Sequence, residues 1–275
     1  MIHATAVIDT QAELDADVTV GAHAVIDGPV RIGAGTCIYP GAYVSGHTTI
    51  GQRCQIHPGA VVGGPPQDIA YGGERSTCTI GDETIIREGA SVHRGGKTDS
   101  STVIGRACML MCNAHVAHDC QLGDRVILTN LAVLAGHVVV EDDVLFAGII
   151  GVHQFVRIGT VAMISGMTRV SMDVPPFFTC AGDGRCIGVN TVGMRRVGYS
   201  LAEIQDARQA YRTLYRAGLP FRRAVERLGE TAATDTGRRI AAFVRAPSKR
   251  GYAGGARRGR DRRADRDRDE TVDAG

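Results

Sequence analysis

Every sixth residue is apolar in the stretch from Ile104 to Val170, which reads IGRACM LMCNAH VAHDCQ LGDRVI LTNLAV LAGHVV VEDDVL FAGIIG VHQFVR IGTVAM ISGMTR V. The same series runs back to Ile2. Of its 29 positions, 25 are Ile, Leu or Val and one is Phe146. A period of six fits neither a helix nor a simple alternating strand. It predicts a repeat architecture, which decides the fold.

The repeat predicts a solenoid of short strands, each pointing one aliphatic side chain inward before the chain turns a corner. Three such six-residue units close one coil, and stacked coils pair as parallel strands around a triangular core. The interruptions at Asp68, Glu74 and Thr98 fall in residues 63–79 and 93–103, which are rich in Gly, Pro, Ser, Thr and charge. We therefore expect an all-β solenoid with two loops thrust out from it.

The repeat fades after Val170, and the sequence then predicts helices. Val174-Pro175-Pro176 marks a bend, residues 186–190 are expected to follow the last coil, and the solenoid domain is predicted to cover residues 1–190. Ser200 and Glu203 form a capping box that opens a helix over 201–217. Further helices are predicted over 220–228 and 236–245, which makes residues 191–246 a small helical domain. Residues 247–275, rich in Arg and Asp, are predicted to be a disordered tail.

Composition narrows the class of protein. No window approaches 18 consecutive apolar residues, which excludes a transmembrane helix, and the N-terminus shows no signal peptide, so a cytoplasmic location is expected. The eight cysteines form no C-x-x-C pair and are interpreted as reduced core residues. The formal charge of +2 comes from the tail: residues 247–275 hold nine basic and six acidic groups, and the rest of the chain has a net charge of −1. Nucleic acid is therefore not an expected partner.

Histidines gather at one predicted edge of the prism. Positions i and i+18 stack in neighbouring coils about 4.8 Å apart, so His118 lies beneath Gly136 and His137. The next coil brings further polar residues to the same edge, although an exposed polar ladder is the alternative interpretation. The predicted cluster consists of His115, His118, Asp119, His137, His153 and Gln154.

Two chemistries use such a cluster. Zinc needs three converging neutral imidazoles, but the sequence lacks the H-x-x-x-x-H spacing of β-helical carbonic anhydrases. General base catalysis needs one histidine with a partner that fixes its tautomer. Asp119 follows His118 directly, and because strand neighbours face opposite ways, the two can touch only at a turn. Base catalysis is favoured, with no metal and no other cofactor.

Four motifs resemble the UDP-N-acetylglucosamine acyltransferase family of lipid A biosynthesis. They are N-A-H-V-A-H-D-C at 113–120, L-A-G-H-V at 134–138, V-H-Q-F at 152–155 and D-V-P-P at 173–176. Gln67-Asp68, Tyr71 and Gly73-Glu74 in the first loop and H-R-G at 93–95 in the second also match. The resemblance covers residues 1 to about 245, and it implies a left-handed parallel β-helix.

The resemblance also implies a reaction, the transfer of a 3-hydroxyacyl chain from acyl carrier protein to the 3-hydroxyl of UDP-N-acetylglucosamine (UDP-GlcNAc), which is the first step of lipid A biosynthesis. His118 would be the general base, with Asp119 beside it, and the Gly136 N–H would stabilise the oxyanion. Gly166 aligns with the end of the acyl groove, which favours a longer, tetradecanoyl-like chain. The implied substrate-binding residues are Asp68, His93, His115, His137, His153, Gln154, Gly166, Asn190, Arg195 and Arg196.

Three positions depart from the family pattern: Ala70 replaces a Lys, Val192 a Glu and Val197 an Arg. All three bear on the sugar nucleotide, so a variant UDP-amino sugar remains an alternative acceptor. Two further functions stay open, a non-catalytic β-helix that only binds and a metal-dependent hydratase.

Partners are expected as well. One histidine edge cannot enclose a nucleotide sugar and an acyl chain, so a homotrimer with clefts between subunits is predicted. Arginines at helical spacing form a candidate surface for acyl carrier protein. They are Arg208, Arg212 and Arg216, followed by Arg222 and Arg223.

Overall fold

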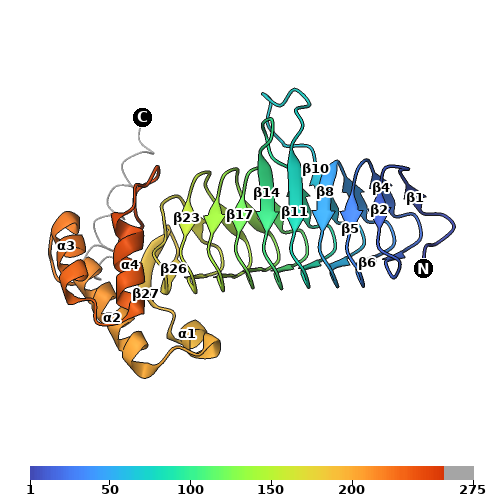
Figure 1. Ribbon diagram of the computed structural model, residues 1–275. Helices are drawn as coiled ribbons and strands as arrows, with labels where there is room; N and C mark the ends of the chain where they lie inside the picture. The colour runs from blue at the N-terminus through green and yellow to red at the C-terminus, as the bar shows by residue number, and fades with distance from the viewer. Residues whose placement is uncertain (257–275) are drawn as a thin grey trace, which may run out of the picture.

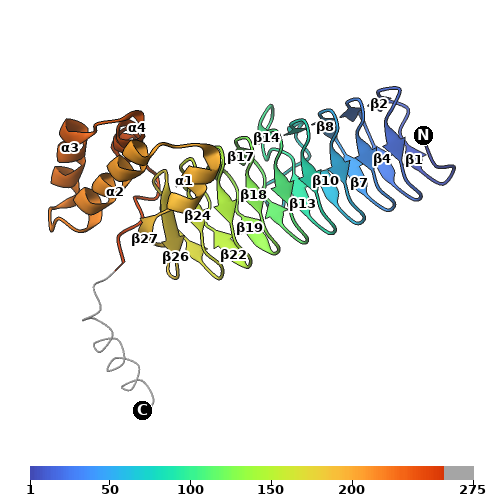
Figure 2. The same ribbon diagram turned by 90° about the horizontal axis from the view of Figure 1, so that it is seen from below.

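The protein is a long prism of parallel coils with helices at its C-terminal end (Figure 1). The computed structural model describes residues 1–256. Within that range the short strands form three sheets, called sheets I, II and III below, that run along the three faces of the prism (Figure 2). The solenoid predicted from the six-residue repeat is confirmed.

Each sheet takes one strand from each successive coil, and sheet III ends with β27, which turns back against β26. Sheet I contains β1 (Val7–Ile8), β4 (Val25–Asp27), β7 (Tyr43–Ser45), β10 (Val61–Gly64), β13 (Ser91–His93), β16 (His115–Val116), β19 (Ala132–Leu134), β22 (Ile150–Val152) and β25 (Arg169–Val170). Sheet II contains β2 (Glu13–Leu14), β5 (Arg31–Ile32), β8 (His47–Ile50), β11 (Thr77–Ile80), β14 (Ser101–Ile104), β17 (Gln121–Leu122), β20 (Val139–Val140) and β23 (Arg157–Ile158). Sheet III contains β3 (Thr19–Val20), β6 (Cys37–Ile38), β9 (Gln55–Ile56), β12 (Ile85–Ile86), β15 (Met109–Leu110), β18 (Ile127–Leu128), β21 (Leu145–Phe146), β24 (Met163–Ile164), β26 (Phe178–Ala181) and β27 (Arg185–Val189).

The core is a stack of the sixth-position side chains. Leu110 pairs with Leu128 and Leu128 with Phe146 in parallel register, each one coil after the last. These side chains are fully buried, and burial of each stabilises the fold by about 1.5–3 kcal/mol. This apolar stack thus keeps the strands of adjacent coils in register.

The two predicted loops leave the prism at the corner between sheets I and II. Val62 pairs with Val92, 30 positions away rather than 18, and Val92 pairs with Val116, 24 positions away. The excursions therefore add twelve and six residues, which explains why the six-residue phase survives both. The first loop (loop 1) covers residues 65–76 and the second (loop 2) covers 94–100, narrower than predicted because the outer parts of the predicted ranges are strand. Both project from the same side (Figure 1).

The C-terminal helices are α1 (Thr191–Val197), α2 (Leu201–Tyr215), α3 (Phe221–Thr231) and α4 (Asp235–Arg245). The capping box at the start of α2 is confirmed, since the Glu203 N–H donates to Ser200 Oγ and the Ser200 N–H donates to the Glu203 carboxylate. Helix α1 was not predicted. Residues 186–190 do not simply follow the last coil, because β27 turns back antiparallel to β26. No helix within residues 1–256 is long and apolar enough to cross a membrane.

The first part of the expected disordered tail is ordered. Residues 247–256, called the C-terminal strap below, form parallel bridges that join Asp173 to Tyr252 and Cys186 to Gly255. Ala253 is buried and Tyr252 stacks on Phe221. The prediction of disorder is wrong here, because the strap pairs with backbone at the end of the prism, which compensates for its lack of apolar residues. The rest of the predicted tail, residues 257–275, lies outside the described residues.

Candidate active site

The histidines lie at the corner between sheets I and II, directly beside loop 2. His118 and Asp119 occupy the turn between β16 and β17, and His137 occupies the equivalent turn one coil later. Asp119 has φ of 61°, in the left-handed region. This turn breaks the alternation of a strand, so neighbouring side chains can face each other.

His118 and Asp119 form a close pair. His118 Nδ1 lies 2.7 Å from Asp119 Oδ2, with side chains only 16% and 9% exposed. Burial works against ionisation of Asp119, but hydrogen bonds from His118 and the Gly96 N–H outweigh it and lower the pKa of the carboxyl. An ionised carboxylate only accepts, so the His118 Nδ1–H donates to it. This leaves His118 Nε2 with a free lone pair, as a general base requires.

Gly136 lies against the free side of the His118 ring. A Cβ at position 136 would sit 2.7 Å from His118 Nε2, a distance that leaves no room for a side chain. Within residues 1–256, the Gly136 N–H donates to no protein oxygen. A spare backbone donor beside a histidine whose Nε2 is free is an arrangement that can stabilise an oxyanion.

His137 extends the cluster by one coil. Its ring meets His118 edge to face, with centroids 5.2 Å apart, and stacks on Phe155 at 4.6 Å. Burial lowers the pKa of His137, although the carboxylate of Asp119 opposes that shift. Ligand atoms of His118, Asp119 and His137 lie within 4.8 Å of one another, close enough to share a metal ion. Such an ion would compete for Asp119 Oδ2, which already accepts from His118.

His93 and His115 form a second pair near the same corner. Their rings meet edge to face with centroids 4.8 Å apart, and Ser91 Oγ lies 2.8 Å from His115 Nδ1. Burial, helped by the charges of His115, His118 and Arg94, lowers the pKa of His93 to about 4. His93 is therefore neutral near pH 7. Its Nδ1 is buried without a hydrogen-bond partner within the described part of the chain.

The other residues that were predicted at this edge are exposed. Asp68 is exposed on loop 1, where its carboxylate accepts from the Ala70 N–H. Arg94 ties the two loops together, since its side chain donates to the Tyr71 hydroxyl and to the Gly63 carbonyl. His153 and Gln154 are exposed in the turn one coil after His137.

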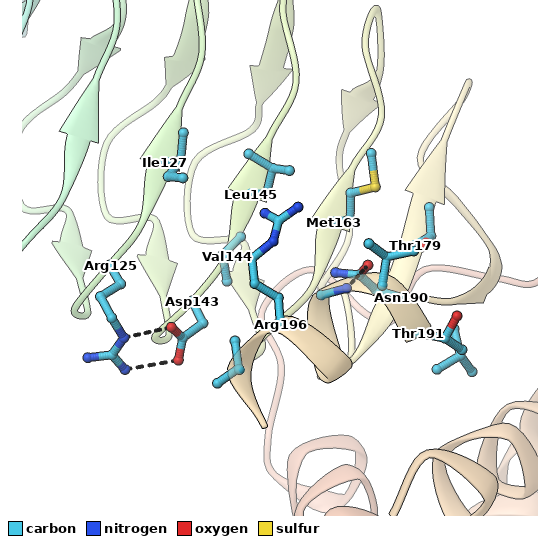
Figure 3. Close-up of a pocket in the computed structure, with 14 residues that line it drawn as sticks. Arg125, Ile127, Asp143, Val144, Leu145, Met163, Thr179, Asn190, Thr191 and Arg196 are labelled. Carbon is cyan, nitrogen blue, oxygen red and sulfur yellow. Dashed lines mark hydrogen bonds and ion pairs between the residues drawn. The ribbon is translucent and has the colours of Figure 1, made fainter. Parts of the chain in front are cut away.

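Asn190 and Arg196 lie elsewhere, on the face of sheet III. They line a pocket of about 750 Å³ between α1 and the outer surface of β18, β21 and β24. Figure 3 shows Arg196 reaching from α1 toward Leu145. Sheet III is the face opposite the histidine corner, so one protomer does not bring these predicted residues together with His118. The Asn190 side chain accepts from the Gly193 N–H and donates to the Val161 carbonyl, so it also caps α1.

Two of the three positions that depart from the family pattern line this pocket. Val192 and Val197 both line it and are exposed, and with Ile127, Leu145 and Met163 they make its wall largely apolar. Ala70 lies on loop 1, at the other edge of the prism.

Gly166 and the other predicted helix arginines do not line this pocket. A Cβ at Gly166 would touch only the Gly148 carbonyl, at 3.4 Å, and the Ala147 methyl group, at 4.0 Å. Arg195 is exposed on α1. Arg208 and Arg212 line a small pocket beside α1.

Several contacts in the site were not found by sequence reasoning. Ser91 lies beside His115 because loop 2 lengthens the offset between these coils to 24 positions. The Thr102 hydroxyl, which accepts from the Asp119 N–H at 2.8 Å, lies 17 positions earlier, about one ordinary coil. Phe155 belongs to the V-H-Q-F motif, but its contact with His137 was not predicted. It follows His137 by one full coil and so stacks above it, which means that this contact could have been found.

The repeat itself has known relatives. The family model described as bacterial transferase hexapeptide (six repeats) matches residues 29–64 and 101–136. The prism with a histidine–aspartate pair at its corner is therefore a hexapeptide-repeat transferase, with the left-handed parallel β-helix as its fold class.

Longer matches identify the family. The model described as UDP N-acetylglucosamine O-acyltransferase, domain 2, matches residues 173–253. A curated relative from Janthinobacterium sp. (strain Marseille), named acyl-[acyl-carrier-protein]–UDP-N-acetylglucosamine O-acyltransferase, is 48% identical over 82% of this chain and 86% of its own. The solved acyltransferase of Francisella novicida superposes with a TM-score of 0.88 at 32% identity, over 92% of this chain and 94% of that one. That of Campylobacter jejuni gives 0.86 and 34%, over 94% and 100%. The chain belongs to the UDP-N-acetylglucosamine O-acyltransferase family.

Proposed function

We propose that the protein transfers a 3-hydroxyacyl chain from acyl carrier protein to the 3-hydroxyl of UDP-GlcNAc, the first step of lipid A biosynthesis. The pairing of His118 with Asp119 opposite Gly136 carries this proposal. The curated relatives are named for this pair of substrates. We also infer a cytoplasmic location, because acyl carrier protein thioesters and UDP sugars are made there.

The reaction follows from the orientation of His118. Its Nε2 accepts the proton of the sugar hydroxyl as that oxygen attacks the thioester carbonyl. The Gly136 N–H donates to the oxyanion of the tetrahedral intermediate. When the intermediate collapses, the C–S bond breaks, the ester remains, and the thiolate takes the proton from the His118 imidazolium. Asp119 stabilises that imidazolium and holds the ring in place.

The same proposal assigns the remaining substrate contacts. Asp68, His115, His153 and Gln154 lie on the edge of the histidine corner or on the loop beside it, where they can contact the sugar and the hydroxyl of the acyl chain. His93 packs edge to face against the His115 ring and helps to hold it. Arg208 and Arg212 are exposed on α2 and offer positive charge to the acidic carrier protein. Arg216 is less available, because it donates to the Tyr211 hydroxyl and to the Ala256 carbonyl of the strap.

We propose a homotrimer in which each active site is shared by two subunits. The histidine corner and the pocket with Asn190 and Arg196 lie on different faces of one protomer. Apolar residues also step along the corner between sheets III and I, one in each coil: Leu131 is 49%, Ile149 59% and Met167 80% exposed. Such a stripe is typical of an interaction surface. Assembly around a three-fold axis parallel to the prism covers it and sets one corner against a neighbour's pocket.

The direct test is incubation of the full chain with 3-hydroxyacyl carrier protein and a panel of UDP sugars, followed by mass spectrometry. UDP-GlcNAc should gain one ester-linked acyl group. If only a UDP-amino sugar is acylated, that sugar is the acceptor. If no UDP sugar is acylated, the protein is a non-catalytic binding protein. Light scattering should give a trimeric mass.

A metal-dependent reaction is the second candidate, because His118, Asp119 and His137 converge. A chelator separates the two functions. Our mechanism predicts full activity after treatment with EDTA and inhibition by added Zn²⁺, since zinc would occupy the general base.

A further inference from the structure

The chain has only two lysines, Lys97 and Lys249, among 31 basic residues. They are far apart in the sequence, on loop 2 and on the C-terminal strap. Lys97 follows Gly96, which donates its N–H to Asp119, and Lys249 lies over the Phe155 ring, which stacks on His137. Two unrelated segments therefore bring the two lysines of this arginine-rich chain to the histidine corner.

Lys249 is held at the corner by the strap. The neighbouring Arg250 donates from Nε to the Ser171 carbonyl, and Asp173 exchanges backbone hydrogen bonds with Gly251 and Ala253. Lys249 Nζ lies 4.4 Å from the centroid of the Phe155 ring. That ring stacks on His137, so the ammonium group and His137 lie on opposite sides of one aromatic ring. A cation above an aromatic face is attracted to it, which limits where the side chain points.

Lys97 is held by loop 2. The preceding residue, Gly96, donates its N–H to Asp119, and a Cβ there would lie 2.9 Å from His118 Nδ1. Loop 2 thus passes directly over the catalytic pair. The Lys97 backbone is fixed at both ends by the Ser100 hydroxyl, which accepts from its N–H and donates to its carbonyl. The Lys97 side chain is exposed.

Neither ammonium group is neutralised by a carboxylate within the described part of the chain. No Asp or Glu oxygen of residues 1–256 lies within 4.0 Å of either nitrogen. Several arginines of the prism, in contrast, are paired, as Arg125 is with Asp143. Two compact cations at one corner can each donate several N–H groups to a phosphate.

We propose that Lys97 and Lys249 form a phosphate-binding clamp beside His137, which positions a substrate for His118. This proposal rests on the proposed function, because both of its substrates carry phosphate. The nucleotide sugar has a diphosphate, and the carrier protein presents its thioester on a phosphodiester-linked arm. The clamp supplies binding rather than chemistry.

The test compares Lys97→Met, Lys249→Met, the double variant and Lys249→Arg. Arg106→Met is the matched control, since Arg106 is exposed, makes no ion pair within residues 1–256 and lies in a turn at another corner. KM is measured separately for UDP-GlcNAc and for the acyl carrier protein. The double variant should raise one KM about tenfold, less at high salt, while kcat changes little. Lys249→Arg should restore most of the loss caused by Lys249→Met.

Binding measurements, which need no turnover, test the phosphate clamp independently of the proposed function. Calorimetry compares two ligand pairs that differ only in phosphate, UDP against uridine and 4′-phosphopantetheine against pantetheine. In the double variant one phosphorylated ligand should lose affinity while its partner does not, and the pair that responds identifies the source. If wild type fails to acylate UDP-GlcNAc, the proposed function is wrong, but these affinities still test the clamp. Unchanged affinity for both phosphorylated ligands would overturn it, as would equal damage from Lys249→Arg and Lys249→Met.

Discussion

The histidine corner and the pocket under α1 are built in different ways. At the corner, His118, Asp119 and Gly136 are fixed by adjacent coils and share direct contacts. In the pocket, Arg196 projects from a seven-residue helix over a largely apolar wall. In our proposal the rigid scaffold therefore holds the reacting groups, whereas recognition of the nucleotide depends on a short helix and on a second subunit. Changes at the corner should affect kcat, and changes in the pocket should affect KM.

The largest expected effect is at the corner. His118→Ala should lower kcat about a hundred- to ten-thousand-fold, because a positioned general base contributes that much. Asp119→Asn, which cannot hold the tautomer in the same way, should also reduce kcat, while Arg196→Ala should mainly raise KM for the UDP sugar. Steady-state kinetics with both substrates checks all three. A His118→Ala enzyme with wild-type kcat would contradict the mechanism.

The next largest effect is expected at Gly166, which the proposed function places at the end of the acyl groove. Gly166→Met adds a side chain where only two atoms of the protomer lie within 4 Å, so it should fold and shorten the groove. Each buried CH₂ contributes about 0.8 kcal/mol, so the preferred donor should become shorter by about two to four carbons. Competition between donors of different length measures the shift. An active variant with an unchanged chain-length profile would show that Gly166 does not limit the groove.

A region of this fold can be predicted from the sequence where the sequence of that region is periodic. The six-residue repeat determines which side chains enter the core and which residues stack in successive coils, so the prism and the alignment of His118, Gly136 and His137 were predictable. The contact between His118 and Asp119 needed one more fact, a left-handed turn at Asp119.

The C-terminal region has no such repeat. Helix α1 contains a glycine and three β-branched residues, which weaken helix propensity, and it is stabilised by the Asn190 cap. The strap has almost no apolar pattern, and its order depends on pairing with Asp173 and Cys186, far away in the sequence. Tertiary contacts of this kind cannot be derived from local propensity.

Removing the strap tests this difference between the periodic prism and the C-terminal region. Ending the chain after Ala246 removes the buried Ala253 and the stacked Tyr252 and exposes their partners. We expect a loss of about 2–4 kcal/mol of stability, seen as a lower melting temperature. A chain ending after Ala256 keeps every described contact and is the control. Equal melting of the two truncated chains would mean that the strap adds nothing.

The smallest effect concerns pH and the buried His93. Its pKa is lowered from 6.5 to about 4, mainly by burial. The unfolded chain takes up a proton at this residue near pH 6.5 and the folded chain does not, so stability falls as pH drops from about 6.5 to about 4. His93→Gln should remove on the order of 2 kcal/mol of this dependence. Urea unfolding at pH 7 and pH 5 measures it, and an identical pH dependence in the variant would contradict the assignment.

The most direct test of the central claim is to mix two impaired subunits. His118→Ala lacks the base and Arg196→Ala lacks the pocket arginine, so each variant alone should be poorly active at low UDP-GlcNAc. If every site takes His118 from one subunit and Arg196 from its neighbour, random co-assembly should restore about a quarter of wild-type activity. Activity equal to the mean of the two separate variants would contradict a shared site.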